Sequence, residues 1–202
     1  MVDAAASGPG VEARSSTSTS VTKSSGWWGI VFTIATEGAV FAYLLFSYYY
    51  LAIASRSVWP TAFLSLKLAL PNTFILLFSS VTFWWAERQF SAGKSSNALL
   101  GLLVTFILGA IFVTVQVVEW QSVSFSPSSG PYGSLYFTTT GFHVAHVVVG
   151  LLIMLALIGW VASGILKDRR QNAVSIGAAY WHFVDAVWLS VFFTYYLTPY
   201  LS

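Results

Sequence analysis

The chain has 202 residues, of which 56% are hydrophobic, 17% aromatic and only 8% charged, and its mean hydropathy is +0.73. Soluble domains carry about 25% charged residues, so this composition excludes an ordinary soluble globular protein. The net charge of +2 is too small to indicate nucleic-acid binding, and the absence of cysteine excludes disulfides, iron–sulfur ligation and cysteine nucleophiles.

The first 25 residues differ in composition from the rest of the chain. They are rich in Ser, Thr, Ala and Gly and contain almost no apolar side chains. Such a segment cannot bury enough surface to offset the entropy cost of folding. We expect residues 1–25 to form a disordered cytoplasmic tail and residues 26–202 to form a single membrane domain.

Five later stretches are each long and apolar enough to cross a membrane, which takes about 20 residues. Short connections between them make each helix antiparallel to its neighbour in sequence. We therefore predict an all-α polytopic membrane protein whose five transmembrane helices form a bundle. The stretches cover about 27–54, 68–86, 98–118, 135–164 and 173–197.

The basic residues are divided unevenly between the two sides of such a bundle. The first loop carries only two, Arg56 and Lys67. Loops with an excess of Lys and Arg stay in the cytoplasm, so the pattern predicts a cytoplasmic N-terminus and a C-terminus outside. The other side carries Arg14, Lys23, Arg88, Lys94, Lys167, Arg169 and Arg170.

Ionisable residues occur within or at the edge of the apolar stretches. An ionisable group at the bilayer centre costs about 2.5–3.5 kcal/mol on insertion scales, unless it is paired or hydrated. Counting along each span places Glu37, His143 and His182 near the midplane, whereas Glu119 closes its span and can reach the interface. The candidates for a buried polar network are Glu37, Glu119, His143, His146, His182 and Asp185.

The spacing of these residues indicates which way they face. His143 and His146 are three residues apart and share a helical face, as do His182 and Asp185. Small residues beside them allow close helix approach, so that polar side chains can bond across the interface. We interpret these residues as contacts that stabilise helix packing, with Asp185 as the partner of His182.

Tyrosines gather near the ends of the first and last spans, at Tyr48 to Tyr50, Tyr195, Tyr196 and Tyr200. Aromatic residues at span ends are typical of anchors at the membrane surface. We interpret all of these tyrosines as interfacial anchors.

Two other chemistries use the same ionisable residues. Three histidines with Asp185 could ligate zinc or iron in a membrane metalloenzyme, although a His-x-x-His pair alone is a weak signal. A proton-coupled transporter centred on Glu37 is a second alternative, although the sequence shows neither broken helices nor inverted repeats.

Two long motifs, YGSLYFTTTGFHVAHVVVG (132–150) and YWHFVDAVWL (180–189), resemble signatures of subunit III of the haem–copper terminal oxidases. The segments TEGAVF (36–41) and LPNTFILLFSS (70–80) and the pair Gln116 and Glu119 resemble further blocks of that family. The resemblance runs from about residue 26 to the end of the chain. It assigns the family's buried glutamate to Glu37, and the motif histidines and aspartate to His143, His146, His182 and Asp185.

The resemblance implies an accessory subunit that has no catalytic, cofactor-binding or metal-ligating residue of its own. In that family, subunit III packs against catalytic subunit I and encloses structural phospholipids in a cleft between its helices. It also supports proton uptake. Subunit II and, in some members, a small subunit IV are further partners, and the partner subunits hold the haem and copper. The complex reduces dioxygen to water and translocates protons, with cytochrome c or a quinol as electron donor.

The sequence departs from the family pattern in length and in detail. The longest members have seven spans, whereas this chain has five, as many bacterial subunits do, which points to a bacterial inner membrane. Val144 stands where the family usually has glycine between the two histidines. The resemblance favours a cytochrome c oxidase, and it leaves open subunit III of a quinol oxidase and the accessory protein of nitric oxide reductase.

Overall fold

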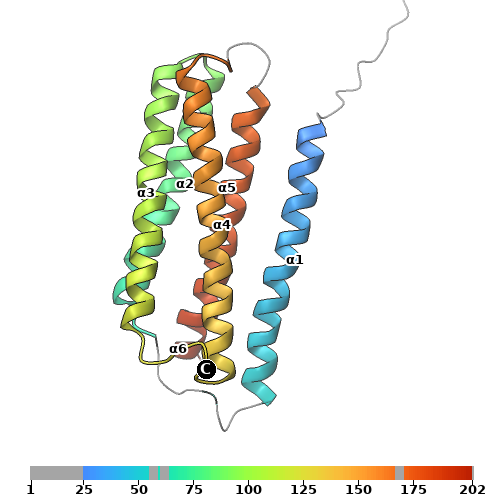
Figure 1. Ribbon diagram of the computed structural model, residues 1–202, viewed down its shortest axis with the longest axis vertical. Helices are drawn as coiled ribbons and strands as arrows, with labels where there is room; N and C mark the ends of the chain where they lie inside the picture. The colour runs from blue at the N-terminus through green and yellow to red at the C-terminus, as the bar shows by residue number, and fades with distance from the viewer. Residues whose placement is uncertain (1–24, 55–58, 60–63, 167–170, 202) are drawn as a thin grey trace, which may run out of the picture.

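The computed structural model describes residues 25–54, 59, 64–166 and 171–201, and within these ranges it contains helices and no strand (Figure 1). The five helices long and apolar enough to cross a membrane confirm the predicted all-α membrane fold. The expected tail lies outside the described residues, except for its last residue. The long helices are α1 (Ser25–Ala54), α2 (Leu66–Ser91), α3 (Ser95–Ser122), α4 (Pro131–Ala162) and α5 (Gln171–Phe192).

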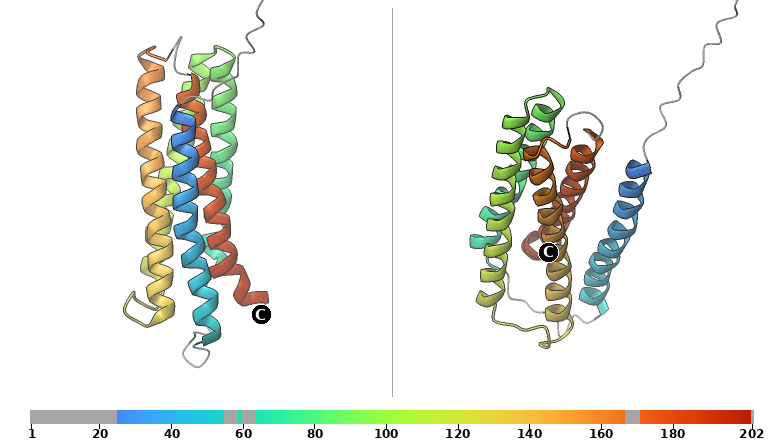
Figure 2. Two further views of the ribbon diagram at one scale, coloured as in Figure 1. Left: turned by 90° about the vertical axis from the view of Figure 1, so that its right-hand side faces the viewer. Right: turned by 45° about the horizontal axis from the view of Figure 1, so that its top comes forward.

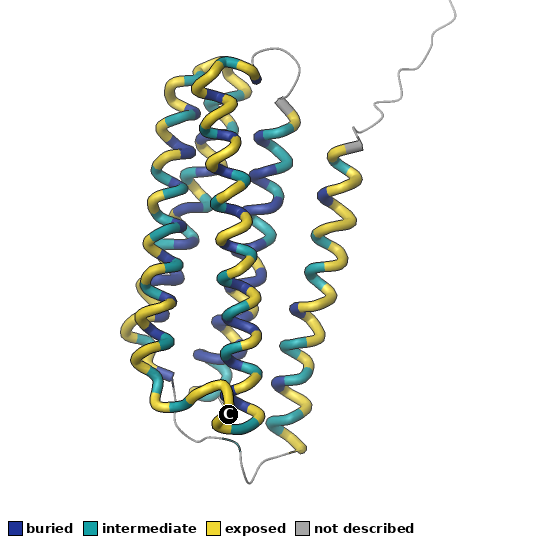
Figure 3. The backbone as a smooth tube through the Cα atoms, in the orientation of Figure 1, coloured by how far each residue is buried: buried dark blue, intermediate teal, exposed yellow. Residues whose placement is uncertain are grey.

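Helices α2 to α5 form a four-helix bundle, and α1 lies beside it (Figures 1 and 2). Helix α1 packs against α5 and α4 and does not pack along α2 or α3. Only 6% of the most apolar stretch of α1 is buried, against 56% in the span that contains α5 (Figure 3). Among the described spans, α1 is therefore the least buried, and α5 lies at the centre of the fold.

The bundle is closely packed around Trp181 of α5, which is almost fully buried. Gly109 of α3 and Gly150 of α4 lie against its indole ring, so closely that a Cβ atom at either position would lie under 3.0 Å from a ring carbon. The indole Nε1–H donates to Ser79 Oγ of α2 at 3.0 Å. One side chain thus joins three neighbouring helices and has its polar atom satisfied.

A second buried indole repeats this arrangement seven residues later. Trp188 donates through Nε1–H to Thr73 Oγ1 of α2, at 3.0 Å. Residues seven apart lie on the same helical face, so both tryptophans of α5 point towards α2. Hydroxyl groups of α2 therefore set the register between these two helices.

The last span ends in an irregular turn that changes the position of two tyrosines. After α5 the chain forms the π-helical segment η1 (Phe193–Leu197) and the short helix α6 (Thr198–Leu201). Tyr195 and Tyr196, although consecutive, are both fully buried in η1. Tyr195 shares a hydrogen bond with Thr139 of α4, with 3.0 Å between the oxygens.

The expectation that the tyrosines are interfacial anchors is therefore wrong for Tyr195 and Tyr196, and also for Tyr48, which is buried in α1. The rings of Tyr48 and Tyr195 contact edge to face, with centroids 4.7 Å apart, so these tyrosines fill the space between α1 and the bundle. For Tyr195 and Tyr196 the physical reason is the wider π-helical turn of η1, which allows two consecutive residues to lie in the interior. Tyr50 and Tyr200 are exposed, as expected.

Candidate functional site

The six ionisable residues singled out in the sequence lie in different helix interfaces. Glu37 meets His146 between α1 and α4, while His182 and Asp185 lie where α5 faces α2. Glu119 lies inside the bundle near η1. The histidines therefore do not converge on one point.

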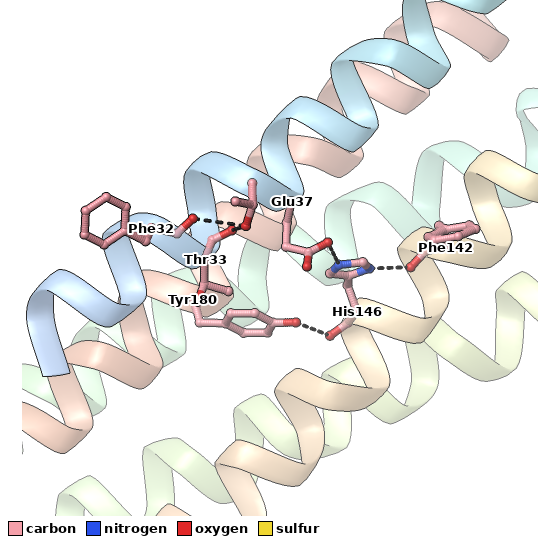
Figure 4. Close-up of polar contacts among 7 residues, drawn as sticks. Phe32, Thr33, Glu37, Phe142, His146 and Tyr180 are labelled. Carbon is pink, nitrogen blue, oxygen red and sulfur yellow. Dashed lines mark hydrogen bonds and ion pairs between the residues drawn. The ribbon is translucent and has the colours of Figure 1, made fainter.

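Glu37 and His146 form a polar contact between α1 and α4 (Figure 4). Glu37 Oε2 lies 3.0 Å from His146 Nε2, and the side chains are 37% and 14% exposed, respectively. Tyr180 of α5 donates its hydroxyl to the backbone carbonyl of His146 at 3.3 Å. Three helices thus meet at this pair.

The hydrogen bond made by the second ring nitrogen of His146, Nδ1, shows where the protons of the pair lie. Nδ1 lies 2.7 Å from the Phe142 carbonyl oxygen, and a carbonyl can only accept a hydrogen bond, so Nδ1 carries a proton. The contact between Nε2 and Glu37 then holds one further proton, either on the imidazole as an ion pair or on the carboxyl group. Because the pair is neutral overall in both forms, it fits a mid-membrane position better than either charge alone.

His143 lies in a different environment, although it is only one turn from His146. It is fully buried among aromatic rings, with ring centroids 5.7 Å from Phe112 and 4.9 Å from Trp188. Neither ring nitrogen has a hydrogen-bond partner among the described residues. His143 therefore acts in this fold as a packing residue of the bundle core.

His182 does not pair with Asp185, so the expected partnership between them is wrong. His182 Nδ1 instead shares a hydrogen bond with Ser80 Oγ of α2. The Asp185 side chain is buried, with 4% of it exposed, and Ser80 lies near it. Neither carboxylate oxygen of Asp185 accepts a hydrogen bond from a described residue. Two residues three apart share a face of one helix, but here the neighbouring helix supplies the hydrogen-bonding atom.

Glu119 lies inside the bundle, so the expectation that its side chain reaches the membrane interface is wrong. Tyr196 donates its hydroxyl to Glu119 Oε1 at 2.8 Å, and the oxygens of Tyr136 and Tyr196 are 3.1 Å apart. Since the Tyr196 proton is directed at Glu119, Tyr136 donates to Tyr196. The buried Gln116 lies beside this chain of hydroxyl groups.

Metal binding finds no support in this arrangement. Among the described residues, no group of three or more His, Asp or Glu side chains could hold a metal ion. The residues of the metalloenzyme alternative, His143, His146, His182 and Asp185, are separated by the contacts described above. The arrangement is instead one of short polar contacts between pairs of helices.

Comparison with known proteins agrees with the motifs. The sequence matches the family described as cytochrome c oxidase subunit III over residues 11–200. The chain belongs to the cytochrome c oxidase subunit III family.

Relatives named cytochrome c oxidase subunit 3 show how far this membership extends. That of Loxodonta africana is 33% identical over 177 residues, which cover 84% of this chain and 68% of the relative. That of Mus musculus is 32% identical with the same coverage. That of Neurospora crassa is 31% identical over 176 residues, covering 83% of this chain and 65% of the relative.

Several hydrogen-bond partners of the candidate residues could not be predicted from the sequence. Ser80 falls within a quoted motif, yet nothing in its spacing pairs it with His182, which is 102 positions away. The position of Tyr196 near the end of a span predicts a surface anchor, yet the same position also fits a buried donor to Glu119. The only sequence feature that could have predicted this contact is the presence of an acid, Glu119, at the end of an apolar stretch.

Proposed function

We propose that this chain is the non-redox accessory subunit of a bacterial haem–copper terminal oxidase of the cytochrome c type. The observation that carries the proposal is the family match over residues 11–200, together with relatives of 31–33% identity that bear the name cytochrome c oxidase subunit 3. Catalysis belongs to subunit I, which with subunit II holds the haem and copper, and a small subunit IV is a further partner.

In this proposal, the polar contacts of the chain maintain a rigid scaffold beside subunit I. The Glu37–His146 pair attaches α1 to α4, and the Ser80–His182 bond attaches α2 to α5. Polar contacts of this kind in helical membrane proteins contribute about 0.6 kcal/mol on average. Their combined effect is to hold the helices in one arrangement, which sustains the proton uptake and turnover of the complex.

Structural phospholipids are proposed to occupy the space beside α1. Large apolar and aromatic residues of α1 are exposed, among them Phe32, Tyr43 and Phe46, and α1 packs along only two of the other long helices. Acyl chains match such a surface, because they cover aromatic and aliphatic side chains without requiring hydrogen bonds. The bound lipid would correspond to the structural phospholipids that the family resemblance predicts.

The subunit is proposed to lie in the bacterial inner membrane with its N-terminus in the cytoplasm and its C-terminus outside. Arg88 and Lys94, at the junction of α2 and α3, lie at the same end as the start of α1 (Figure 1). The excess of basic residues at this end supports a cytoplasmic location for it. Residues 1–25 are proposed to be a disordered tail that precedes the membrane domain.

Purification from native membranes through a tag on this chain tests the proposal. The tagged chain is expected to bring down a haem-containing subunit with a Soret band and oxidase activity. The same chain expressed and purified alone should show neither. A stoichiometric Soret band or a tightly bound metal on the isolated chain would contradict the proposal.

The electron donor is tested on the same purified complex. Oxygen consumption with reduced cytochrome c supports the cytochrome c type, whereas consumption with a quinol alone reassigns the complex to the quinol oxidases. Reduction of nitric oxide in place of dioxygen reassigns it to the nitric oxide reductases.

A further inference from the structure

Five tyrosines form a continuous series of contacts from the lipid-facing surface of α1 to the buried acid Glu119. They come from α1, η1 and α4, and each contacts the next through its ring or its hydroxyl group. The first of them is exposed and the other four are buried. We call this series the tyrosine chain; its members, in order from the surface, are Tyr49, Tyr48, Tyr195, Tyr136 and Tyr196.

Ring contacts join the outer members of the tyrosine chain. The ring centroids of Tyr49 and Tyr48 lie 5.3 Å apart, and those of Tyr48 and Tyr195 lie 4.7 Å apart. Tyr136 follows, with its ring centroid 5.7 Å from that of Tyr195. All three contacts are edge to face, a favourable arrangement of aromatic rings. Because electron tunnelling falls steeply with distance, rings in contact exchange an electron far faster than rings that lie further apart.

Hydrogen bonds join the inner members and end at a base. Tyr136 donates to Tyr196, with 3.1 Å between the oxygens, and Tyr196 donates to Glu119 Oε1 at 2.8 Å. A phenol loses an electron most readily when a hydrogen-bonded base takes its proton in the same step, because no phenol cation then forms in the apolar core. Tyr196 is the member of the tyrosine chain whose acceptor is a carboxyl group. The most readily oxidised phenol therefore lies at the buried end.

The outer end of the tyrosine chain is placed to meet oxidised lipid. Tyr49 lies close to the last turn of α1, and its hydroxyl oxygen is 3.3 Å from Thr194 Oγ1 of η1. Unsaturated acyl chains react with dioxygen to give lipid peroxyl radicals, and a phenol donates a hydrogen atom to such a radical. The sequence has no cysteine, whose thiol would otherwise react readily with oxidants. An exposed phenol near the membrane surface is therefore a suitable donor.

We propose that the tyrosine chain is a radical relay that stops lipid peroxidation beside this protein. Tyr49 gives a hydrogen atom to a lipid peroxyl radical, and the unpaired electron then moves inward to Tyr196, whose proton passes to Glu119. The relay takes no part in electron transfer to dioxygen, so the accessory role of the subunit is unchanged. It also requires no partner subunit.

The two steps balance in atoms and electrons. In the first, the phenolic O–H bond of Tyr49 breaks and the O–H bond of a lipid hydroperoxide forms. In the second, Tyr196 supplies an electron through the tyrosine chain to the Tyr49 phenoxyl radical, which takes up a proton from the aqueous surface. The proton of Tyr196 passes at the same time to the Glu119 carboxylate. The products are the lipid hydroperoxide, restored Tyr49, a buried Tyr196 phenoxyl radical and protonated Glu119.

Electron paramagnetic resonance tests where the radical comes to rest. The full-length chain is placed in nanodiscs of polyunsaturated phosphatidylcholine, and a lipid-soluble azo initiator generates peroxyl radicals there. An excess of a nitroso spin trap removes radicals from exposed side chains. We expect a tyrosyl signal that persists in the presence of the trap and narrows when the protein contains ring-deuterated tyrosine.

Three variants assign this persistent signal. Tyr196→Phe removes the buried phenol and Glu119→Gln removes its base, so each is expected to abolish the signal. Tyr43→Phe is the control, because Tyr43 is an exposed phenol of α1 that lies outside the tyrosine chain. It is expected to leave the persistent signal unchanged.

Tyr48→Phe gives a second readout, at the surface. The phenylalanine ring keeps the packing against Tyr195, but a phenoxyl radical does not oxidise it, so the relay is interrupted. The radical is then confined to Tyr49, and a spin-trap adduct is expected to accumulate there, located by fragmentation mass spectrometry. The wild-type chain should carry much less adduct at Tyr49, whereas the adduct at Tyr43 should be equal in the two proteins.

The inference is overturned if the wild-type chain gives no persistent tyrosyl signal, or if the signal survives in Tyr196→Phe or Glu119→Gln. Equal amounts of adduct at Tyr49 in Tyr48→Phe and the wild type would also overturn it. Because Tyr196 and Glu119 lie in the core, the fold of each variant is compared with that of the wild type by circular dichroism and gel filtration. If a core variant misfolds, Tyr48→Phe decides the outcome.

Discussion

At the level of single residues, the buried acid Glu119 shows how this protein accommodates an ionisable group inside an apolar bundle. Its Oε1 accepts from the Tyr196 hydroxyl, which in turn accepts from Tyr136, so that each hydroxyl proton has an acceptor. Burial of these groups without such a chain would leave donors or acceptors unsatisfied, at a cost of about 1–3 kcal/mol each. The tyrosine hydroxyls therefore contribute to the stability of the core in addition to the aromatic rings.

Tyr196→Phe removes the donor to Glu119 and keeps the ring. We expect the isolated protein in detergent to lose about 1–3 kcal/mol of stability. This should appear as a lower temperature at which half of the protein remains monodisperse in gel filtration. Tyr43→Phe, which alters an exposed phenol of α1, is the control and should behave as the wild type. Equal stability of the two variants would show that the Tyr196 hydroxyl does not support the core.

At the level of helices, Trp181 determines how closely α3 and α4 approach α5. Gly109 and Gly150 leave the space that its indole ring occupies, and its hydrogen bond to Ser79 prevents the ring from turning aside. Small residues have this effect in membrane bundles because association there depends on packing and hydrogen bonds rather than on exclusion of water.

Gly150→Ala tests this packing on α4. The added Cβ would lie 2.8 Å from Cε3 of Trp181, which is too close, so the helices must separate. We expect a loss of about 1–3 kcal/mol in stability, measured by the same thermal assay. Gly141→Ala on the same helix is the matched control, because no atom lies within 4 Å of its added Cβ. A loss of equal size at both positions would mean that helix propensity, and not contact with Trp181, is responsible.

At the level of the whole molecule, the attachment of α1 distinguishes this protein from a uniformly packed bundle. Among the long helices, α1 packs mainly against α4 and α5; it also meets the end of the last span, where Tyr49 lies within hydrogen-bond distance of Thr194 and Thr198, and its buried positions are few (Figure 3). The Glu37–His146 contact, the Tyr48 ring and the hydrogen bonds of Tyr49 are therefore the specific contacts that hold α1 in place.

Glu37→Leu is expected to loosen α1 without unfolding α2 to α5. The natural chain has no cysteine, so spin labels can be placed at Tyr50→Cys of α1 and Val118→Cys of α3, both exposed. Loss of a contact worth about 0.6 kcal/mol, and at most about 1.7 kcal/mol, should broaden the distance distribution between the labels. Thr36→Val is the control, because the Thr36 hydroxyl bonds only carbonyls of its own helix. An unchanged distribution in Glu37→Leu would assign the attachment of α1 to its other contacts, namely its apolar packing and the hydrogen bonds of Tyr49 with Thr194 and Thr198.

The amino-acid sequence by itself determined the five spans, the all-α class and the positions of the ionisable groups along each helix. Hydropathy is a local property, and a run of about 20 apolar residues has few alternatives to a membrane helix. The motifs around His143, His146, His182 and Asp185 were likewise sufficient for the family. The predicted bounds differ from the observed ones mainly at the ends, as at α4, which begins at Pro131 rather than near residue 135.

Only the tertiary structure decided which groups meet. His182 bonds Ser80 and not Asp185, Tyr195 and Tyr196 turn inward in η1, and Glu37 selects His146 rather than His143. Each outcome depends on the rotation and axial shift of one helix against another, and these are set by the fit of side chains such as Trp181 against glycines far away in the chain. No local pattern contains that information, because a change of one residue in register brings a different face of the helix into contact.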